Sequence, residues 1–124
     1  MPRQIVLNAF DMNCVGPVQQ GLWTYARDQS TRYLDIHCWT ALAQTLEAGL
    51  VDGLFLADVV GVYDVYCGNA DAALRGAVQL PVNDPMLLIP ALAGATTHLG
   101  FGVTANLIYE APTCLPAACA RSTP

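Results

Sequence analysis

The sequence predicts an α/β fold in which helices connect parallel strands. Three short, mostly apolar runs recur along the 124 residues, and segments with helical character lie between them. Near-continuous apolar runs are typical of strands that are buried on both faces, as in the parallel sheets of α/β proteins. A chain of this length is expected to form one ordinary domain.

The composition favours a globular protein and excludes several function classes. Hydrophobic residues make up 54% of the chain and charged residues 12%, which is typical of a folded core rather than of disorder. The net charge of −5 is not that of a nucleic-acid-binding protein, which needs a basic surface. The N-terminal apolar run is too short for a secretory signal, and no run reaches the roughly 18 residues of a membrane span. These features predict a cytoplasmic protein without a membrane anchor.

The five cysteines do not form a metal or disulfide motif. They stand at positions 14, 38, 67, 114 and 119, an odd number without CxxC spacing. A disulfide framework is not expected in the cytoplasm, and no metal site is predicted. Each thiol is interpreted as a small buried or incidental residue unless other observations give it a role.

The first unit is a strand, a loop and a helix. Gln4–Phe10 is predicted to be a buried strand, and Asp11–Arg32, with several Gly and Pro residues, to be a loop. A helix follows within residues 34–50, with Asp35 as its N-cap and Gly49 after its end. Its apolar positions share one face: Ile36, Trp39, Leu42, Ala43 and Leu46.

The second unit begins with Asp52–Asp58, a buried strand that ends in a carboxylate, and continues in a long polar loop. Asp84 and Pro85 then predict the start of a helix over 85–99, kinked at Pro90 and ended by Gly100. The third strand is predicted over 101–109.

Unusual residues gather where α/β proteins place their chemistry. The segments Phe10–Trp23, Asp58–Gln79 and Thr104 onward all follow carboxyl ends of strands, so they share one edge of the sheet. Three strands cannot close a barrel, which leaves a small open sheet or the first part of a larger fold. In both cases the first strand has an exposed edge.

Individual residues leave several interpretations open. No dinucleotide, P-loop or metalloprotease motif is present, and the single histidines His37 and His98 are interpreted as structural. Asp58 can bind a ligand or cap the following loop. Tyr63 can form a ligand wall or anchor its loop, while Cys14 and Gln79 carry no signal of their own. The residues alone therefore predict a site at the strand ends without naming a reaction.

Several blocks together resemble a known family, the luciferase-like flavin monooxygenases. The closest branch contains nitrilotriacetate monooxygenase component A and long-chain alkane monooxygenase. The resemblance covers Gln4 to Tyr109, and it implies that residues 1–109 are the N-terminal part, about three βα units, of a (β/α)8 TIM-like barrel. The blocks occur in the family's order and spacing: "NAFDMNCVG", "GLW", "RDQSTRY", "DGLFLADVVGVYDVY", "AVQLPVNDP" and "HLGFGVT".

This resemblance implies a two-component oxygenase. A separate flavin reductase would supply reduced FMN, and O₂ would be the co-substrate for oxidation of a small organic compound of the alkane, sulfone or aminopolycarboxylate class. A full-length protein of this family is expected to be a homo-oligomer. The competing hypothesis is a truncated, non-catalytic fragment, or a flavin-binding or partner-binding module without turnover.

The resemblance also assigns roles to single residues. Asp58 and Thr104 match positions that contact FMN at the ends of the second and third strands, and Phe10 would lie near the flavin. Cys14, Tyr63 and Gln79 match positions lining the catalytic pocket of the alkane-oxidising branch.

Two departures from the family pattern stand out. Pro17 replaces a histidine of the branch, which removes any acid, base or N–H donor role there. Residues 110–124 diverge from the family block entirely, and we interpret this tail as the product of a frameshift. On this interpretation five strands of the barrel are missing, and the isolated chain is expected to be marginally stable and inactive.

Overall fold

The computed structural model describes residues 5–16, 21–59 and 61–105. Its centre is a parallel sheet in the order β1-β2-β3. The strands are β1 (Asn8–Met12), β2 (Gly53–Ala57) and β3 (Gly100–Val103). The expected α/β class with parallel strands is confirmed.

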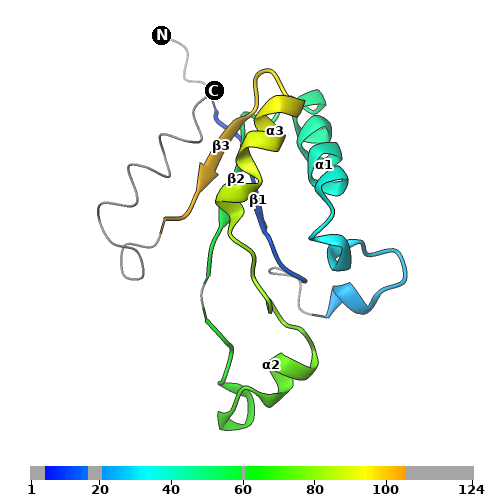
Figure 1. Cartoon of the computed structure of the whole chain (residues 1–124), viewed down its shortest axis with the longest axis vertical. Coiled ribbons are helices and arrows are strands. Elements are labelled where there is room, and N and C mark those ends of the chain that lie inside the picture. Colours follow the sequence, from blue (N-terminus) through cyan, green and yellow to red (C-terminus); the bar gives the residue numbers. More distant parts are fainter. Residues whose placement is uncertain (1–4, 17–20, 60, 106–124) are drawn as a thin grey trace.

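Two helices cover one face of this sheet, and a third lies beyond the strand ends (Figure 1). The helices are α1 (Ile36–Ala48), α2 (Asp71–Arg75) and α3 (Ile89–Ala95). Short 3₁₀ turns occupy Leu22–Thr24, Ser30–Arg32, Tyr66–Gly68 and Pro85–Leu87. No helix in the described ranges is long and apolar enough to cross a membrane.

Helix α1 forms where the sequence predicts it. The Asp35 carboxylate accepts a hydrogen bond from the backbone N–H of His37 at 2.9 Å, which satisfies one of the unpaired donors of the first turn. The indole N–H of Trp39 donates to the carbonyl of Tyr33 at 2.7 Å and ties the preceding loop to the helix. The chain leaves the helix through Leu50, which has a φ of 57°.

The main core lies between the sheet and its helices. Leu54 and Leu56 of β2 point toward α1 and α3, where Leu92 is fully buried. Alternation along the strand places these side chains on one face. The buried members of this core are Trp39, Ala43, Leu54, Leu56, Leu88, Ile89, Leu92 and Leu99.

The first strand differs from its prediction. It runs over Asn8–Met12 rather than Gln4–Phe10, and Gln4 lies outside the described residues. The expectation that it is buried on both faces is wrong for this structure, because Ile5 is 83% and Phe10 52% exposed. The physical reason is that helices cover only one face of the sheet among the described residues.

The helix predicted over 85–99 is also different. Asp84 accepts a hydrogen bond from the N–H of Met86 as expected, but Pro85–Leu87 is a 3₁₀ turn that precedes α3. Pro90 lies in the first turn of α3, where its missing N–H costs nothing and causes no kink.

Helix α3 ends early. Thr96 has extended dihedrals, and the turn after it leads directly into β3, so Gly100 begins a strand rather than ending a helix. The strand predicted over 101–109 ends at Val103, and Thr104 and Ala105 follow it outside the strand. Residues 106–124, which include the divergent tail, lie outside the described residues.

Candidate active site

The sheet brings two of the three predicted cofactor residues, Asp58 and Thr104, to the carboxyl ends of neighbouring strands. The strands are parallel, Met12 pairs with Ala57, and Leu56 pairs with Val103. The N–H of Thr104 continues this ladder by donating to the carbonyl of Leu56 at 3.1 Å. Asp58 and Thr104 therefore follow neighbouring strands at the same carboxyl edge, as the sequence predicts.

Phe10 lies on the sheet face opposite the helices. Its ring stacks on Phe55 with centroids 6.0 Å apart and planes 28° from parallel. Gly102 is beside Phe55 in the next strand, and a Cβ there would come within 3.0 Å of the Phe55 ring. Glycine thus leaves room for an aromatic platform on this face.

Cys14 is in an apolar cluster at the end of β1. Its side chain is 2% exposed and packs with Met12, Ala57 and Val82. Burial and, to a smaller extent, the nearby Asp11 carboxylate together raise the pKa of the Cys14 thiol to about 11. The thiol is protonated at neutral pH, so it does not act as a thiolate nucleophile or general base.

A segment far along the chain covers the end of β1. The N–H of Gln79 donates to the carbonyl of Val15 at 3.2 Å, and the N–H of Asn83 donates to that of Asn13 at 2.9 Å. These bonds place Gln79, whose φ is 54°, beside the Cys14 cluster. Sequence periodicity carries no signal for such a long-range pairing.

Asn13 is a site residue that sequence reasoning missed. It is 3% exposed, and its side-chain oxygen Oδ1 has no hydrogen-bond donor among the described residues. A buried acceptor without a partner costs free energy and requires a donor from water or a ligand. The only signal in the sequence is its place directly after an apolar strand.

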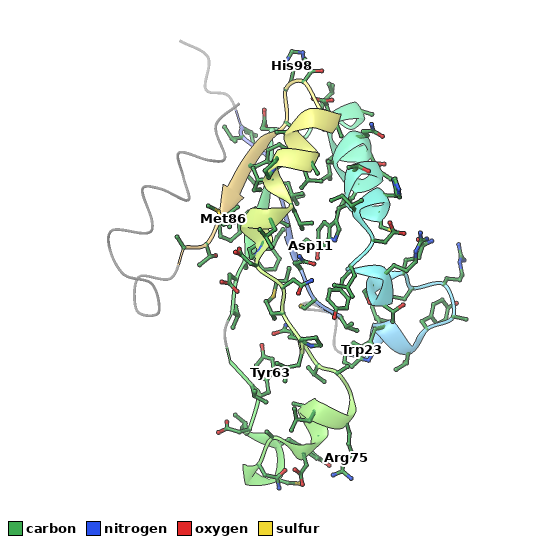
Figure 2. The ribbon with its side chains drawn as sticks, in the orientation of Figure 1. Asp11, Trp23, Tyr63, Arg75, Met86 and His98 are labelled. Carbon is green, nitrogen blue, oxygen red and sulfur yellow. The ribbon has the colours of Figure 1, made fainter. Side chains whose placement is uncertain are left out.

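Asp58 and Tyr63 are in different surroundings. Burial raises the pKa of Asp58, and the carboxylate of Asp84 adds to this rise. Tyr63 is 56% exposed in the loop between β2 and α2, beyond the strand ends (Figure 2). Asp58 and Thr104 therefore follow the ends of neighbouring strands, and Cys14 and Gln79 lie past the end of β1. Phe10 lies within β1 on the open face of the sheet, and Tyr63 lies on the loop. His98 lies at the opposite end of the sheet (Figure 2).

A cavity of about 670 Å³ lies between the end of β1, the segment 22–33 and α1. Cys14, Asp11 and Trp23 contribute to its wall. Burial raises the pKa of Asp11, against the opposing effect of a hydrogen bond from the N–H of Met12. Gly16, with a φ of +63°, allows the Trp23 ring to lie directly against the backbone, since a side chain there would overlap the ring.

Comparisons with known proteins give close relatives. No protein-family model matches the chain. It is 55% identical over 112 residues, 90% of this chain, to the long-chain alkane monooxygenase of Geobacillus thermodenitrificans, and covers 26% of that protein. It is 54% identical over 112 residues to the dimethyl-sulfide monooxygenase of Hyphomicrobium sulfonivorans, covering 23% of it. Nitrilotriacetate monooxygenase component A of Aminobacter aminovorans is 34% identical over 79% of the chain, which spans 22% of that relative.

Solved structures agree with these relatives. The chain matches the crystal structure of a long-chain alkane monooxygenase with a TM-score of 0.93 at 51% identity, over 98% of this chain and 28% of that one. A riboflavin lyase solved with modified FMN and riboflavin matches with a TM-score of 0.86 at 26% identity, over 97% of this chain and 27% of that one. The chain thus spans about a quarter of the length of the proteins it resembles.

Proposed function

We propose that this chain belongs to the luciferase-like monooxygenases, a family built on a (β/α)8 barrel, and that its strand ends hold reduced FMN. A complete barrel would use this flavin and O₂ to oxidise a small organic substrate, with a separate flavin reductase supplying the reduced cofactor. Relatives named for alkane, dimethyl sulfide, nitrilotriacetate and dibenzothiophene sulfone support this class of substrate.

The described residues fit the chemistry of a flavin. Its ring system has apolar faces and a polar edge of N–H donors and carbonyl acceptors. The strand ends offer the Asp58 carboxylate, the Thr104 hydroxyl and the unpartnered Oδ1 of Asn13 as hydrogen-bonding groups. The stacked rings of Phe10 and Phe55 offer an apolar surface on the open face of the sheet.

The protein's residues bind and orient, while bound flavin supplies the activation of O₂. We assign Asp58 and Thr104 to the polar edge of the cofactor and Cys14 and Gln79 to the adjoining pocket wall. Cys14 contributes a thiol that its pKa of about 11 keeps protonated and neutral. Because this thiol is close-packed, it helps to exclude water from the pocket. Gln79 offers an amide, which can donate and accept without titrating.

The observation that carries the proposal is the common edge on which Asp58 and Thr104 lie. Flavin fluorescence titrations with oxidised and anaerobically reduced FMN test it. Asp58→Asn should weaken binding about tenfold, the effect of losing a charge-assisted hydrogen bond. Asp64→Asn, in an exposed loop position, is the matched control and should bind like wild type. A folded wild-type chain that binds FMN no better than Asp58→Asn would contradict the proposal.

A second candidate function is a flavin-binding module without turnover. The observation in its favour is that this chain spans about a quarter of its relatives. An assay with a flavin reductase, NADH, FMN and either dimethyl sulfide or hexadecane separates the two. FMN binding with substrate oxidation supports the oxygenase, whereas binding without oxidation supports the module.

A further inference from the structure

Asn13 carries a buried acceptor that the fold leaves without a donor. The residue is 3% exposed, and in the described ranges its Oδ1 is the only buried side-chain oxygen or nitrogen that has no hydrogen-bond partner. The large majority of buried polar groups in folded proteins have a partner. An unsatisfied acceptor costs free energy, which is recovered when a ligand or a water molecule supplies a donor.

The backbone on both sides holds Asn13 in place. Its carbonyl oxygen accepts a hydrogen bond from the N–H of Asn83 at 2.9 Å. Its neighbours Met12 and Cys14 are buried in one apolar cluster with Ala57. Met12 and Cys14 also line the cavity of about 670 Å³, whereas Asn13 does not, so water in that cavity is not its partner. A donor therefore has to reach Oδ1 where it lies.

Asn13 is next to a residue that we assign to the polar edge of the flavin. Met12 pairs with Ala57 in the register of β1 and β2, so Asn13 and Asp58 are the residues that follow at the two carboxyl ends. Neighbouring strands lie about 4.8 Å apart. An ionised carboxylate only accepts hydrogen bonds, as does the oxygen of an amide. Adjacent strand ends thus present two acceptors.

The two redox states of a flavin offer different numbers of donors to such a pair. The oxidised ring system has a single N–H, at N3, while N1 and N5 are acceptors. Two-electron reduction adds a proton at N5, so the reduced ring carries an N–H on each side of the C4 carbonyl. Two neighbouring acceptors can both be satisfied by the reduced ring, whereas they compete for the one donor of the oxidised ring.

We propose that Asn13 is a specificity-determining residue, whose buried Oδ1 makes this chain bind reduced FMN more tightly than oxidised FMN. The inference rests on the proposed function and adds to it the residue that selects the redox state of the cofactor. A single acceptor such as the Asp58 carboxylate does not distinguish the two forms, because N3 carries its N–H in both. The second acceptor, Oδ1 of Asn13, provides the difference.

Anaerobic calorimetric titrations with reduced and with oxidised FMN test this proposal. The wild-type chain should bind the reduced form about tenfold more tightly, the effect of one additional satisfied hydrogen bond. Asn13→Leu keeps the branched shape of the side chain and removes the acceptor, so its two dissociation constants should be nearly equal. The midpoint potential of the bound flavin should then fall by about 30 mV relative to wild type, because tenfold corresponds to this shift for a two-electron couple.

Three further variants make the result specific to the acceptor. Asn83→Leu is the matched control, because it makes the same substitution at a half-buried neighbour, and it should keep the wild-type ratio of affinities. Asn13→Asp retains an acceptor at this position and should keep the preference for the reduced form. If circular dichroism shows that Asn13→Leu is unfolded, Asn13→Ala replaces it with the same expected result, since alanine adds no bulk.

Failure of this inference and failure of the proposed function give different results. A wild-type chain that binds neither form of FMN would overturn both. Binding of both forms with a ratio that Asn13→Leu leaves unchanged, or that Asn83→Leu changes equally, would overturn the inference alone. Tighter binding of oxidised FMN by the wild type would also overturn it, because Asn13 would then present its amide N–H₂ group to an acceptor of the oxidised ring.

Discussion

At the scale of single residues, burial decides what the thiols can do. Cys14 is 2% exposed and has a pKa of about 11, whereas Cys67 is exposed on the loop after β2. Thiolate is the reactive form, so iodoacetamide at pH 7.5 should modify Cys67 rapidly and leave Cys14 unmodified in the folded chain. Peptide mass spectrometry after timed labelling measures both rates. Equal rates would show that the Cys14 cluster is open to solvent.

At Asp58, the stability of the fold and the proposed binding of FMN make opposite demands on the side chain. Its pKa is raised in the fold by burial and by Asp84, so the protonated form is favoured. The contribution of this carboxyl to stability is therefore fully present below its unfolded pKa, 3.8, and is lost as the pH rises through the folded value. Asp58→Asn should raise the melting temperature at pH 7 by up to about 4 °C while weakening FMN binding.

A melting series between pH 3 and pH 7 checks this prediction. The stability gain of Asp58→Asn over wild type should shrink toward the acidic end, where the wild-type carboxyl is protonated. Asp64→Asn should show no such gain, because its side chain is in an exposed loop position. A variant that is less stable than wild type at pH 7 would show that Asp58 is a structural cap.

At the scale of elements, local sequence patterns predict individual helices and strands better than they predict long-range contacts. Helix α1 follows from Asp35 and from the apolar face around Trp39, all of which lie within a few turns of chain. The five-residue α2 is too short for its periodicity to be visible in the sequence. The segment that covers Cys14 depends on backbone bonds to residues more than sixty positions away, which no local pattern encodes.

One carboxylate of α1 holds the turn between α3 and β3. Oε1 of Glu47 accepts hydrogen bonds from the backbone N–H groups of Thr97 at 2.7 Å, of Leu99 at 3.2 Å and of His98. These bonds, that from His98 first, hold the pKa of Glu47 below its usual value. The resulting stabilisation is present above the unfolded pKa and is lost as the pH falls through the lowered one.

Glu47→Gln should therefore lower the melting temperature at pH 7, and the difference from wild type should shrink as the pH falls toward 3. Thermal melts monitored by circular dichroism at both pH values measure it. A difference as large at pH 3 as at pH 7 would mean that the charge on Glu47 is not what holds the turn.

Leu92 tests whether α3 and the sheet form one core. It is fully buried among Leu54, Leu56 and Trp39, so Leu92→Ala should cost roughly 2–5 kcal/mol of unfolding free energy. Leu87 is 77% exposed, and Leu87→Ala should change stability by no more than about 0.5 kcal/mol. Urea titration measures both, and similar values for the two variants would contradict the core assignment.

At the scale of the whole molecule, the sheet has a covered face and an open one. The helix face carries the main core, while the opposite face presents Phe10 and Phe55 at 52% and 39% exposure. The sequence predicts both faces as buried, because its apolar runs belong to a barrel in which further strands complete the interior. This is why the strand ends and their polar residues could be predicted, whereas the accessibility of the strands could not.

The open face has a measurable consequence. Apolar surface that lacks its cover binds the dye anilinonaphthalene sulfonate, so the isolated chain should enhance the dye's fluorescence and self-associate as its concentration rises. Replacing Phe10 and Phe55 with serine together should reduce both signals, because the two stacked rings form the apolar centre of that face. Leu87→Ser, on an exposed turn outside this face, is the control and should leave both signals unchanged. Dye fluorescence that the double serine variant leaves unchanged would mean that the dye binds to another surface of the chain.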